Sequence, residues 1–328
     1  MTPDSRLEAL TRWVGDALPG RGELTPASVD ASFRRYFRVQ TDDGTCIAVD
    51  APPEREDCGR YVRVARAFRA LGLHVPEILA ADLAQGFLLV TDLGRRPYLD
   101  ALNEETVERL YGDALGALIV LQAGSRVEPG LLPPYDAALL ERELAIFPEW
   151  YVGRHLGREL TTAQRSGLSR VFDRLVASAL EQPRVWVHRD YHSRNLMVTA
   201  SNNPGILDFQ DAVEGPVTYD VVSLLRDCYI AWPRERVEDW AKGYYELGVQ
   251  SGVPVGESEE QFLEWFDLMG VQRHLKAAGI FARLLHRDGK PGYLADVPRT
   301  LGYVREVSAR YPALRPLAVL LGELAGPP

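Results

Sequence analysis

Two short acidic motifs, joined by a turn-rich segment, constrain this chain more than any other feature of its sequence. Residues 188–195 read HRDYHSRN and residues 207–209 read LDF. Between the motifs, the apolar residues on either side of 199–205 are strand-like, while 199–205 itself contains Asn, Pro and Gly. The spacing therefore predicts a β-hairpin that holds Asn195 and Asp208 side by side.

The chemistry of phosphoryl transfer gives each of these polar side chains a role. Asp190 would accept the hydrogen bond of an attacking hydroxyl group, Asn195 would give Mg²⁺ a neutral oxygen ligand, and Asp208 would bridge Mg²⁺ to the nucleotide phosphates. A lone His-x-Asp is common and could be an accidental loop with a capping aspartate, but the compound pattern rarely arises by chance. The motifs therefore predict a kinase that uses ATP and Mg²⁺.

Composition narrows the partners of such an enzyme. The chain has 328 residues, 46% hydrophobic and 25% charged, with a formal net charge of −9 and no basic block. This charge disfavours nucleic acid or an anionic membrane surface as a partner, and favours a small-molecule substrate. The N-terminus lacks a hydrophobic signal core, and no apolar run approaches the ~20 residues of a membrane span. We expect a monomer in the cytoplasm.

The cysteines agree with that location. Cys46, Cys58 and Cys228 are widely spaced, odd in number and form no Cys-x-x-Cys pair. This usage disfavours both a disulfide framework and a structural zinc site. Free thiols in a reducing compartment are expected.

Hydrophobic periodicity predicts a β-rich first part and a helical remainder. A helix at 5–18 precedes strands at 33–40, 45–50, 78–81 and 87–91, with a helix at 57–71 between them. From Pro97 onward the pattern is mainly helical. The predicted helices there are 103–123, 136–147, 162–181, 217–231, 235–248, 258–285 and 314–324.

The two motifs, together with the Thr91-Asp92-Leu93-Gly94 hinge, resemble those of the aminoglycoside phosphotransferase superfamily of small-molecule kinases. The resemblance covers nearly the whole chain and implies an α+β, two-lobed protein-kinase-like fold. It places a nucleotide-binding lobe at 1–93 and a catalytic and substrate-binding lobe at 94–328.

Five further segments resemble a narrower group, the anomeric sugar kinases. They are 32–38, 50–53, 147–151, 213–221 and 270–276. This likeness implies ATP-dependent phosphorylation of N-acetylmuramate and N-acetylglucosamine on the C1 hydroxyl. The α-1-phosphate products would serve cell-wall sugar recycling.

The nucleotide site departs from the protein-kinase pattern. The strand at 46–50 has no lysine for the phosphates, and the next helix has no interior glutamate. Arg34, Arg35 or Arg38 is the nearest cationic supply, with Arg34 or Arg35 preferred as the replacement, although any of them could merely solvate an exposed hairpin. Backbone amides and the hydroxyl of Ser28 or Ser32 are expected to cover the phosphates.

Adenine recognition is expected from backbone groups of the hinge. The candidate residues are Leu89, Thr91 and Asp92. The side chain of Asp92 is expected to cap a turn, so no catalytic role is assigned to it.

The acceptor pocket should combine polar groups for hydroxyls with an aromatic wall for a sugar ring. The candidates are Glu149, Tyr151, Arg226, Asp227, Arg273 and His274. Arg226 or Arg273 could bind the carboxylate of N-acetylmuramate, and an open pocket is an alternative. The resemblance also implies that His188 and Asp220 support the Asp190 loop.

Other functions remain open at this point. The acceptor could be an aminoglycoside, choline, thiamine or a hydroxylated amino acid. The missing lysine and the absence of a glycine-rich loop would suit a pseudokinase or nucleotide-binding regulator, although Asp190, Asn195 and Asp208 are all present. A protein kinase is disfavoured because no Ala-Pro-Glu-like activation segment follows Phe209.

Overall fold

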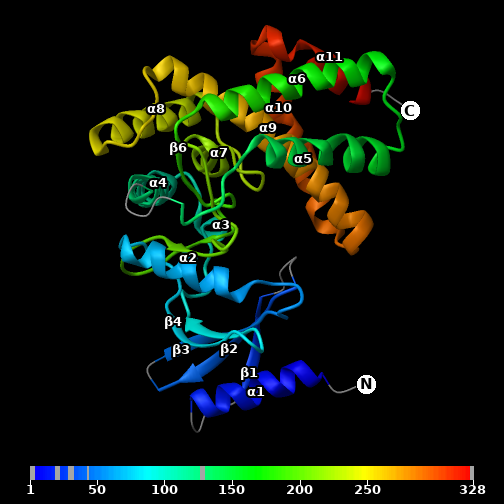
Figure 1. Ribbon diagram of the computed structural model, residues 1–328. Coiled ribbons are helices and arrows are strands. Elements are labelled where there is room, and N and C mark those ends of the chain that lie inside the picture. Colours follow the sequence, from blue (N-terminus) through cyan, green and yellow to red (C-terminus); the bar gives the residue numbers. More distant parts are fainter. Residues whose placement is uncertain (1–3, 19–22, 29–32, 43, 126–129, 326–328) are drawn as a thin grey trace. The chain divides into compact units, whose positions relative to one another are not determined.

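The protein consists of two compact units, each built from two separate stretches of chain. A computed structural model describes residues 4–18, 23–28, 33–42, 44–125 and 130–325. One unit contains residues 1–113 and 194–211, and the other contains 114–193 and 212–328 (Figure 1). The first boundary between the units, after residue 113, therefore lies inside helix α4, Val107–Gly124. The assignment of functions to lobes at 1–93 and 94–328 stays a prediction.

The first unit is organised around a five-stranded antiparallel sheet with the order β1-β2-β3-β5-β4. Its strands are β1 (Leu24–Ser28), β2 (Arg35–Thr41), β3 (Gly44–Asp50), β4 (Ile78–Asp82) and β5 (Phe87–Thr91). The predicted hairpin of β2 and β3 is confirmed, and so are β4 and β5. Strand β1 was not predicted, because Pro26 disfavours a strand. It is accommodated at the edge of the sheet, where the register shifts between Pro26 and Ser28.

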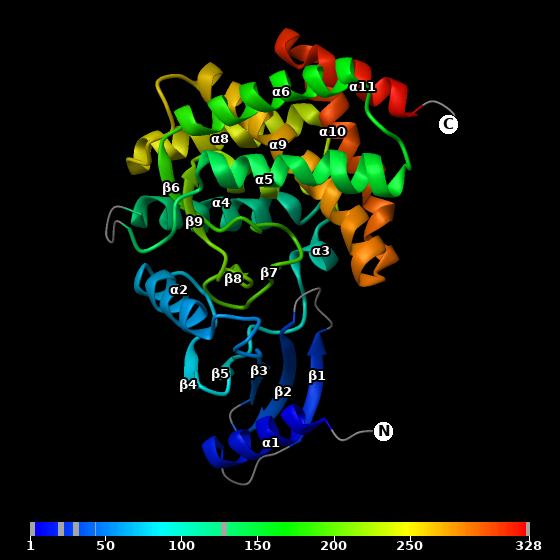
Figure 2. The same cartoon turned by 45° about the vertical axis from the view of Figure 1, so that its right-hand side comes forward.

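One face of this sheet is covered by the N-terminal helix. Helix α1 (Ser5–Ala17) begins after Asp4, whose side chain accepts a hydrogen bond from the Leu7 N–H at 3.1 Å. Leu10 and Val14 of α1 are fully buried. They pack in one cluster with the buried sheet residues Phe37, Val39, Cys46, Ala48, Phe87 and Leu89. Figure 2 shows α1 lying against the strands of this sheet. The apolar stripe predicted at 5–18 is therefore confirmed as a core-facing helix.

The same unit contains the hairpin that carries the second motif. Strands β7 (Leu196–Met197) and β8 (Gly205–Ile206) pair antiparallel, which confirms the predicted hairpin. Phe209 is fully buried against helix α2 (Cys58–Ala70), with ring centroids 4.8 Å from Tyr61 and 5.9 Å from Phe68. The short helix α3 spans Tyr98–Ala101. Because Phe209 follows Asp208 directly, its packing on α2 holds the backbone at Asp208 in place.

The second unit is built around the 30-residue helix α9, Glu259–Asp288 (Figure 1). The other helices are α5 (Ala137–Ile146), α6 (Thr162–Glu181), α7 (Tyr219–Leu225), α8 (Arg234–Ser251), α10 (Val297–Arg310) and α11 (Arg315–Ala325). Strands β6 (Arg184–Val187) and β9 (Val213–Pro216) pair antiparallel beside them. In the described residues, no helix is long and apolar enough to cross a lipid bilayer.

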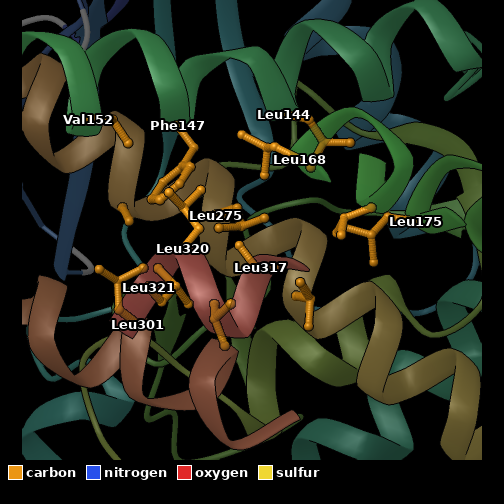
Figure 3. Close-up of a cluster of buried hydrophobic side chains, with 14 of the residues drawn as sticks. Leu144, Phe147, Val152, Leu168, Leu175, Leu275, Leu301, Leu317, Leu320 and Leu321 are labelled. Atoms are coloured by element: carbon orange, nitrogen blue, oxygen red, sulfur yellow. The ribbon is translucent and has the colours of Figure 1, made fainter. Parts of the chain in front are cut away.

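One hydrophobic core of this unit lies where α9 meets its neighbours. Leu275 of α9, Leu144 of α5 and Leu168 of α6 meet Leu301 of α10 and Leu317 of α11 in one buried cluster (Figure 3). Each of these side chains is less than a tenth exposed. Burial of so much aliphatic surface is the main force that holds the helices together.

Three helical segments differ from the predictions. The helix predicted at 217–231 ends at Leu225, because the following residues make long-range hydrogen bonds, such as that from the Ser193 N–H to Asp227. Helix α10 was missed because proline and glycine punctuate this region, yet Pro298 stands in the first turn, where it is tolerated. A π-helical segment at Phe147–His155 (η1), with Pro148 at its start, was not predicted.

Candidate active site

The loop that carries Asp190 follows strand β6 and is held by a buried aspartate on α7. The two carboxylate oxygens of Asp220 accept hydrogen bonds from the His188 N–H at 2.6 Å and the Arg189 N–H at 3.0 Å. Arg189 adopts φ +77°, a left-handed conformation that is unfavourable for a residue with a Cβ. The two bonds to Asp220 offset that cost. This geometry supports the predicted bracing role of His188 and Asp220.

Asp190 keeps its negative charge although it is partly buried. Burial by itself would raise the pKa of Asp190, but the positive charges of Lys276, His192, Arg189 and Arg273 outweigh this effect and lower the pKa below its ordinary value. The carboxylate is therefore ionised at neutral pH. In that state both oxygens are hydrogen-bond acceptors, as required for binding a hydroxyl group.

Two of these cations are fixed by a buried carboxylate on α5. Glu143 accepts hydrogen bonds from Arg189 at 2.6 Å and from Gln272 at 3.1 Å, and forms an ion pair of 2.8 Å with Lys276. The Tyr135 hydroxyl donates a further hydrogen bond to Glu143. Burial would raise the pKa of Glu143, but Lys276 and Arg189 outweigh it and lower the pKa to about 2. The network thus stays ionised at neutral pH.

A pocket in the second unit opens beside Asp190. Its volume is about 450 Å³ including the part open to solvent. His192, Arg273 and Lys276 line it together with Asp190, while Tyr229 and Phe281 form an aromatic wall. The pocket therefore joins an ionised carboxylate, cationic groups and aromatic surface, which is the combination expected for a hydroxylated small molecule.

The two predicted Mg²⁺ ligands belong to the hairpin of the first unit. The Leu207 N–H donates to the Asn195 carbonyl at 2.9 Å, so the chain on each side of the hairpin is tied together at these residues. Asp208 adopts φ +62° and its side chain is 34% exposed. An amide oxygen and a partly exposed carboxylate are hard ligands of the kind that Mg²⁺ prefers. The residues present therefore fit the ion.

The two candidate phosphate-binding arginines differ in their surroundings. Arg35 forms ion pairs with Asp50 and Asp4, so two carboxylates of the first unit already balance its charge. Arg34 pairs with Glu56 at 2.6 Å and also lies 3.7 Å from a carboxylate oxygen of Asp208. This placement favours Arg34 over Arg35. The predicted residue Ser32 lies outside the described residues.

The hinge candidates make structural hydrogen bonds. Leu89 lies inside β5, paired with Ala48 of β3 and with β4 on the other side. The Thr91 N–H donates to the Glu77 carbonyl at 3.0 Å. Asp92 accepts hydrogen bonds from Arg38, Thr45 and the Gly94 N–H, the last at 3.0 Å, as expected of a turn-capping side chain. Adenine recognition by this segment stays a prediction.

Of the six predicted acceptor-binding residues, Arg273 is the one that lines the pocket. Arg226 is buried and pairs with Glu306 at 3.4 Å. The His274 ring nitrogen Nε2 lies 2.8 Å from the Arg226 carbonyl, and burial lowers the pKa of His274 to about 3, so this ring is neutral. These two residues support α7 and α9 from within the core.

The remaining three candidates lie elsewhere in the second unit. Asp227 is buried and accepts hydrogen bonds from the backbone N–H groups of Ser193 and Tyr229, both at 2.9 Å. Tyr151 stacks on Phe147 with a centroid distance of 5.5 Å, because the π-helical segment turns it onto the core. Glu149 is exposed. None of the three lines the pocket beside Asp190.

Several pocket residues were not assigned from the sequence. Lys276 stands three positions after Arg273 on α9, a spacing that places both on one helix face and could have identified it. His192 lies two positions after Asp190, inside the motif itself. Tyr229 and Phe281 carry no local signal, because they reach the pocket through the packing of α9 and the chain after α7.

Sequence comparison places this chain among known phosphotransferases. The profile of the phosphotransferase enzyme family matches residues 23–252. The chain is similar to the N-acetylmuramate/N-acetylglucosamine kinase of Pseudomonas aeruginosa, with 51% identity over 99% of this chain and 98% of that protein. A relative of the same name from Pseudomonas putida is 48% identical over 98% and 97% of the two chains.

Solved structures of more distant proteins share the fold. An ADP-bound aminoglycoside phosphotransferase, APH(2'')-Ib, matches with a TM-score of 0.59 and 15% identity, over 92% of this chain and 98% of that one. A choline kinase from Cryptosporidium parvum matches with a TM-score of 0.64 and 11% identity, over 94% and 98%. These likenesses confirm the predicted two-lobed α+β kinase fold.

Proposed function

This chain belongs to the phosphotransferase enzyme family, as the motifs predicted, and on that premise we propose that it phosphorylates N-acetylmuramate and N-acetylglucosamine with ATP. The acceptor group is the anomeric C1 hydroxyl, and the products are α-1-phosphates. Relatives at 46–51% identity that are named as kinases of these two sugars support the substrates. The observation that carries the proposal is the pocket with Asp190 beside cationic and aromatic side chains.

Asp190 binds and orients the sugar hydroxyl. Its carboxylate is ionised, so it accepts the hydrogen bond of the C1 hydroxyl and aligns the oxygen for in-line attack on the γ-phosphorus. Because phosphoryl transfer proceeds through a loose transition state, Asp190 takes the proton late. Positioning therefore contributes more than basicity, which agrees with the low pKa of the group.

Asn195 and Asp208 would hold Mg²⁺, and Arg34 would contribute a positive charge for the nucleotide phosphates. The bound ion would neutralise the charge that spreads over the phosphate oxygens. Arg34 replaces the lysine that protein kinases carry on a strand, because its charge lies close to Asp208. Leu89, Thr91 and Asp92 form the segment that binds adenine.

The enzyme acts on a small molecule in the cytoplasm as a monomer, without nucleic acid or membrane partners. All three cysteines are buried and free, as expected in a reducing compartment. Light scattering during gel filtration measures the mass directly. A mass near 36.6 kDa supports the monomer, and twice that mass contradicts it.

A substrate panel tests the proposed reaction. Release of ADP from Mg-ATP is measured with N-acetylmuramate, N-acetylglucosamine, glucosamine, kanamycin and choline, and the best product is analysed by ³¹P NMR. The two N-acetylated sugars should be used and should give an anomeric phosphate. Transfer to another hydroxyl would refute the C1 position. Bound ATP without turnover of any acceptor would favour a nucleotide-binding regulator.

A further inference from the structure

Arg273 is a buried cation that forms no salt bridge with any carboxylate of the described residues. In the described part of the chain, two arginines are buried, Arg226 and Arg273, which are 2% and 6% exposed. Arg226 pairs with Glu306. Across the same described residues, Arg273 forms no salt bridge, and the one hydrogen bond of its side chain runs from Nη1 to the Cys228 sulfur at 3.7 Å. Its buried Nε has no hydrogen-bond partner.

Such a position is energetically unfavourable for the protein alone. A guanidinium group taken out of water loses its hydration, and a thiol returns little of that interaction. Arginine does not escape by losing its proton, because its charge persists in proteins. Asp190 and Asp227 attract this charge through space, but neither forms a salt bridge with it among the described residues. An anion from outside the chain that binds the guanidinium directly would therefore restore much of the lost interaction.

Arg273 lies where an anionic group of the acceptor could reach it. The side chain lines the pocket that also contains Asp190. The neighbouring cation Lys276 already has its carboxylate, because Glu143 lies 2.8 Å from its ammonium nitrogen. Of the two permanently charged side chains that line this pocket, Arg273 is therefore the one without a carboxylate in an ion pair, and it can bind a carboxylate on the acceptor. Its planar fork can hold both oxygens of such a group.

We propose that Arg273 binds the lactyl carboxylate of N-acetylmuramate and so determines how well the enzyme uses this sugar relative to N-acetylglucosamine. The inference rests on the proposed function, since the two sugars differ in the lactyl ether that N-acetylmuramate carries. N-acetylglucosamine has no negative charge for Arg273. The residue therefore acts on specificity, while Asp190 acts on the hydroxyl group of both sugars.

The test combines a variant with a neutral ligand. The ratio kcat/KM is measured for N-acetylmuramate, for its lactyl carboxamide and for N-acetylglucosamine, with the wild type and with Arg273→Met. In the variant, kcat/KM for N-acetylmuramate should fall about 30-fold relative to N-acetylglucosamine, mainly through KM, as expected for a lost charge-assisted pair. The wild type should prefer the acid to the carboxamide by a similar factor, and the variant should not distinguish them.

Arg283→Met is the matched control. Arg283 lies on the same helix, is half-buried and does not line the pocket, so this change should leave the ratio between the sugars unchanged. Arg273→Lys keeps the charge without the fork and should fall between the wild type and Arg273→Met. If Arg273→Met does not fold, two other measurements decide whether the proposal holds. They are the wild-type preference for the acid over the carboxamide, and the ratio of kcat/KM for the two sugars in Arg273→Lys.

The possible failures can be told apart. An equal loss for both sugars would place Arg273 in a step common to them and overturn the proposal, as would an unchanged ratio. Equal use of acid and carboxamide by the wild type would also overturn it. If the wild type phosphorylates neither sugar, the proposed function itself is wrong.

Discussion

At the scale of single residues, the second unit keeps the carboxylates of Asp190 and Glu143 ionised although both are withdrawn from water. Asp190 owes its low pKa to surrounding cations, and two of these, Arg189 and Lys276, are in turn held by Glu143. The network separates two kinds of residue. Asp190 faces the pocket and is the residue proposed to bind the hydroxyl group of the acceptor, whereas Glu143 holds its neighbours in place.

Replacing Asp190 should abolish most turnover and leave the protein folded. Asp190→Ala removes the group that orients the hydroxyl, so kcat should fall about 10³-fold. Coupled detection of ADP measures the rate, and circular dichroism checks the fold. Asp190→Asn keeps the shape without the charge and should show a comparable loss. A kcat near the wild-type value in either folded variant would remove Asp190 from the mechanism.

Replacing Glu143 should instead affect stability. Glu143→Gln leaves Arg189 and Lys276 buried without their counter-charge, which should lower the free energy of unfolding by about 3–5 kcal/mol. Urea titration at pH 7 measures the change. Glu141→Gln alters an exposed residue of the same helix and should change stability by no more than about 0.5 kcal/mol. Equal stability of the two variants would show that the Glu143 network contributes little.

The same carboxylate predicts a pH dependence. The folded-state pKa of Glu143 is lowered to about 2 from an ordinary 4.5. The unfolded chain therefore binds the proton more tightly, and the stabilisation is present above pH 4.5 and is lost as the pH falls toward 2. The free energy of unfolding should fall less steeply over this window in Glu143→Gln than in the wild type. Parallel curves would contradict the low pKa.

At the scale of elements, α9 organises the second unit because it is approached closely on several sides. A Cβ added at Gly279 would lie 2.7 Å from both the carbonyl carbon and oxygen of Ile146, at the junction of α5 and the π-helical segment. These are backbone atoms, which cannot move aside as a side-chain end can. The absence of a side chain at 279 therefore sets the approach of α9 to its neighbour.

This contact gives a prediction with an internal control. Gly279→Ala should lower the free energy of unfolding by about 1–3 kcal/mol through overpacking. Gly302→Ala in α10 has no atom within 4 Å of the new Cβ and should raise stability by about 0.5–1 kcal/mol, because alanine favours helix. Chemical denaturation distinguishes the two directions. A stabilised Gly279→Ala protein would refute the close approach.

The sequence predicted those elements whose signals are local. The amphipathic stripe of α1, the β2–β3 hairpin and the hairpin at 196–207 follow from periodicity and turn residues. The end of α7 could not be predicted, because hydrogen bonds to distant residues compete with the helix there. In the site, Arg273 was among the residues predicted, whereas Tyr229 and Phe281 depend on tertiary packing that leaves no local pattern.

At the scale of the whole molecule, the eight-residue motif is divided between the two units. Asp190 belongs to the unit with the acceptor pocket, and Asn195 belongs to the unit with Asp208 and Arg34. The proposed nucleotide and sugar ligands therefore have their residues in different compact units. The boundary between the units at positions 193 and 194 therefore separates the residue proposed for the acceptor from the residues proposed for the nucleotide, although all of the 188–195 motif is continuous in sequence.

Hydrogen exchange can test this division of tasks. N-acetylglucosamine alone should slow amide exchange in α7 and α9, while Mg-ATP alone should slow exchange in the first unit, around 205–211 and β5. Asp208→Ala should weaken the second effect and leave the first unchanged. Protection by the sugar that is confined to the first unit would contradict the assigned acceptor pocket.

The edges of the five-stranded sheet have a consequence for the protein at high concentration. The outer strands β1 and β4 both contain a register shift, and Pro26 removes one backbone N–H from β1. An irregular edge is a poor template for a strand from another molecule. The edges of this sheet therefore disfavour edge-to-edge pairing between copies of the chain. The two outer strands of the first unit should thus limit aggregation at high concentration.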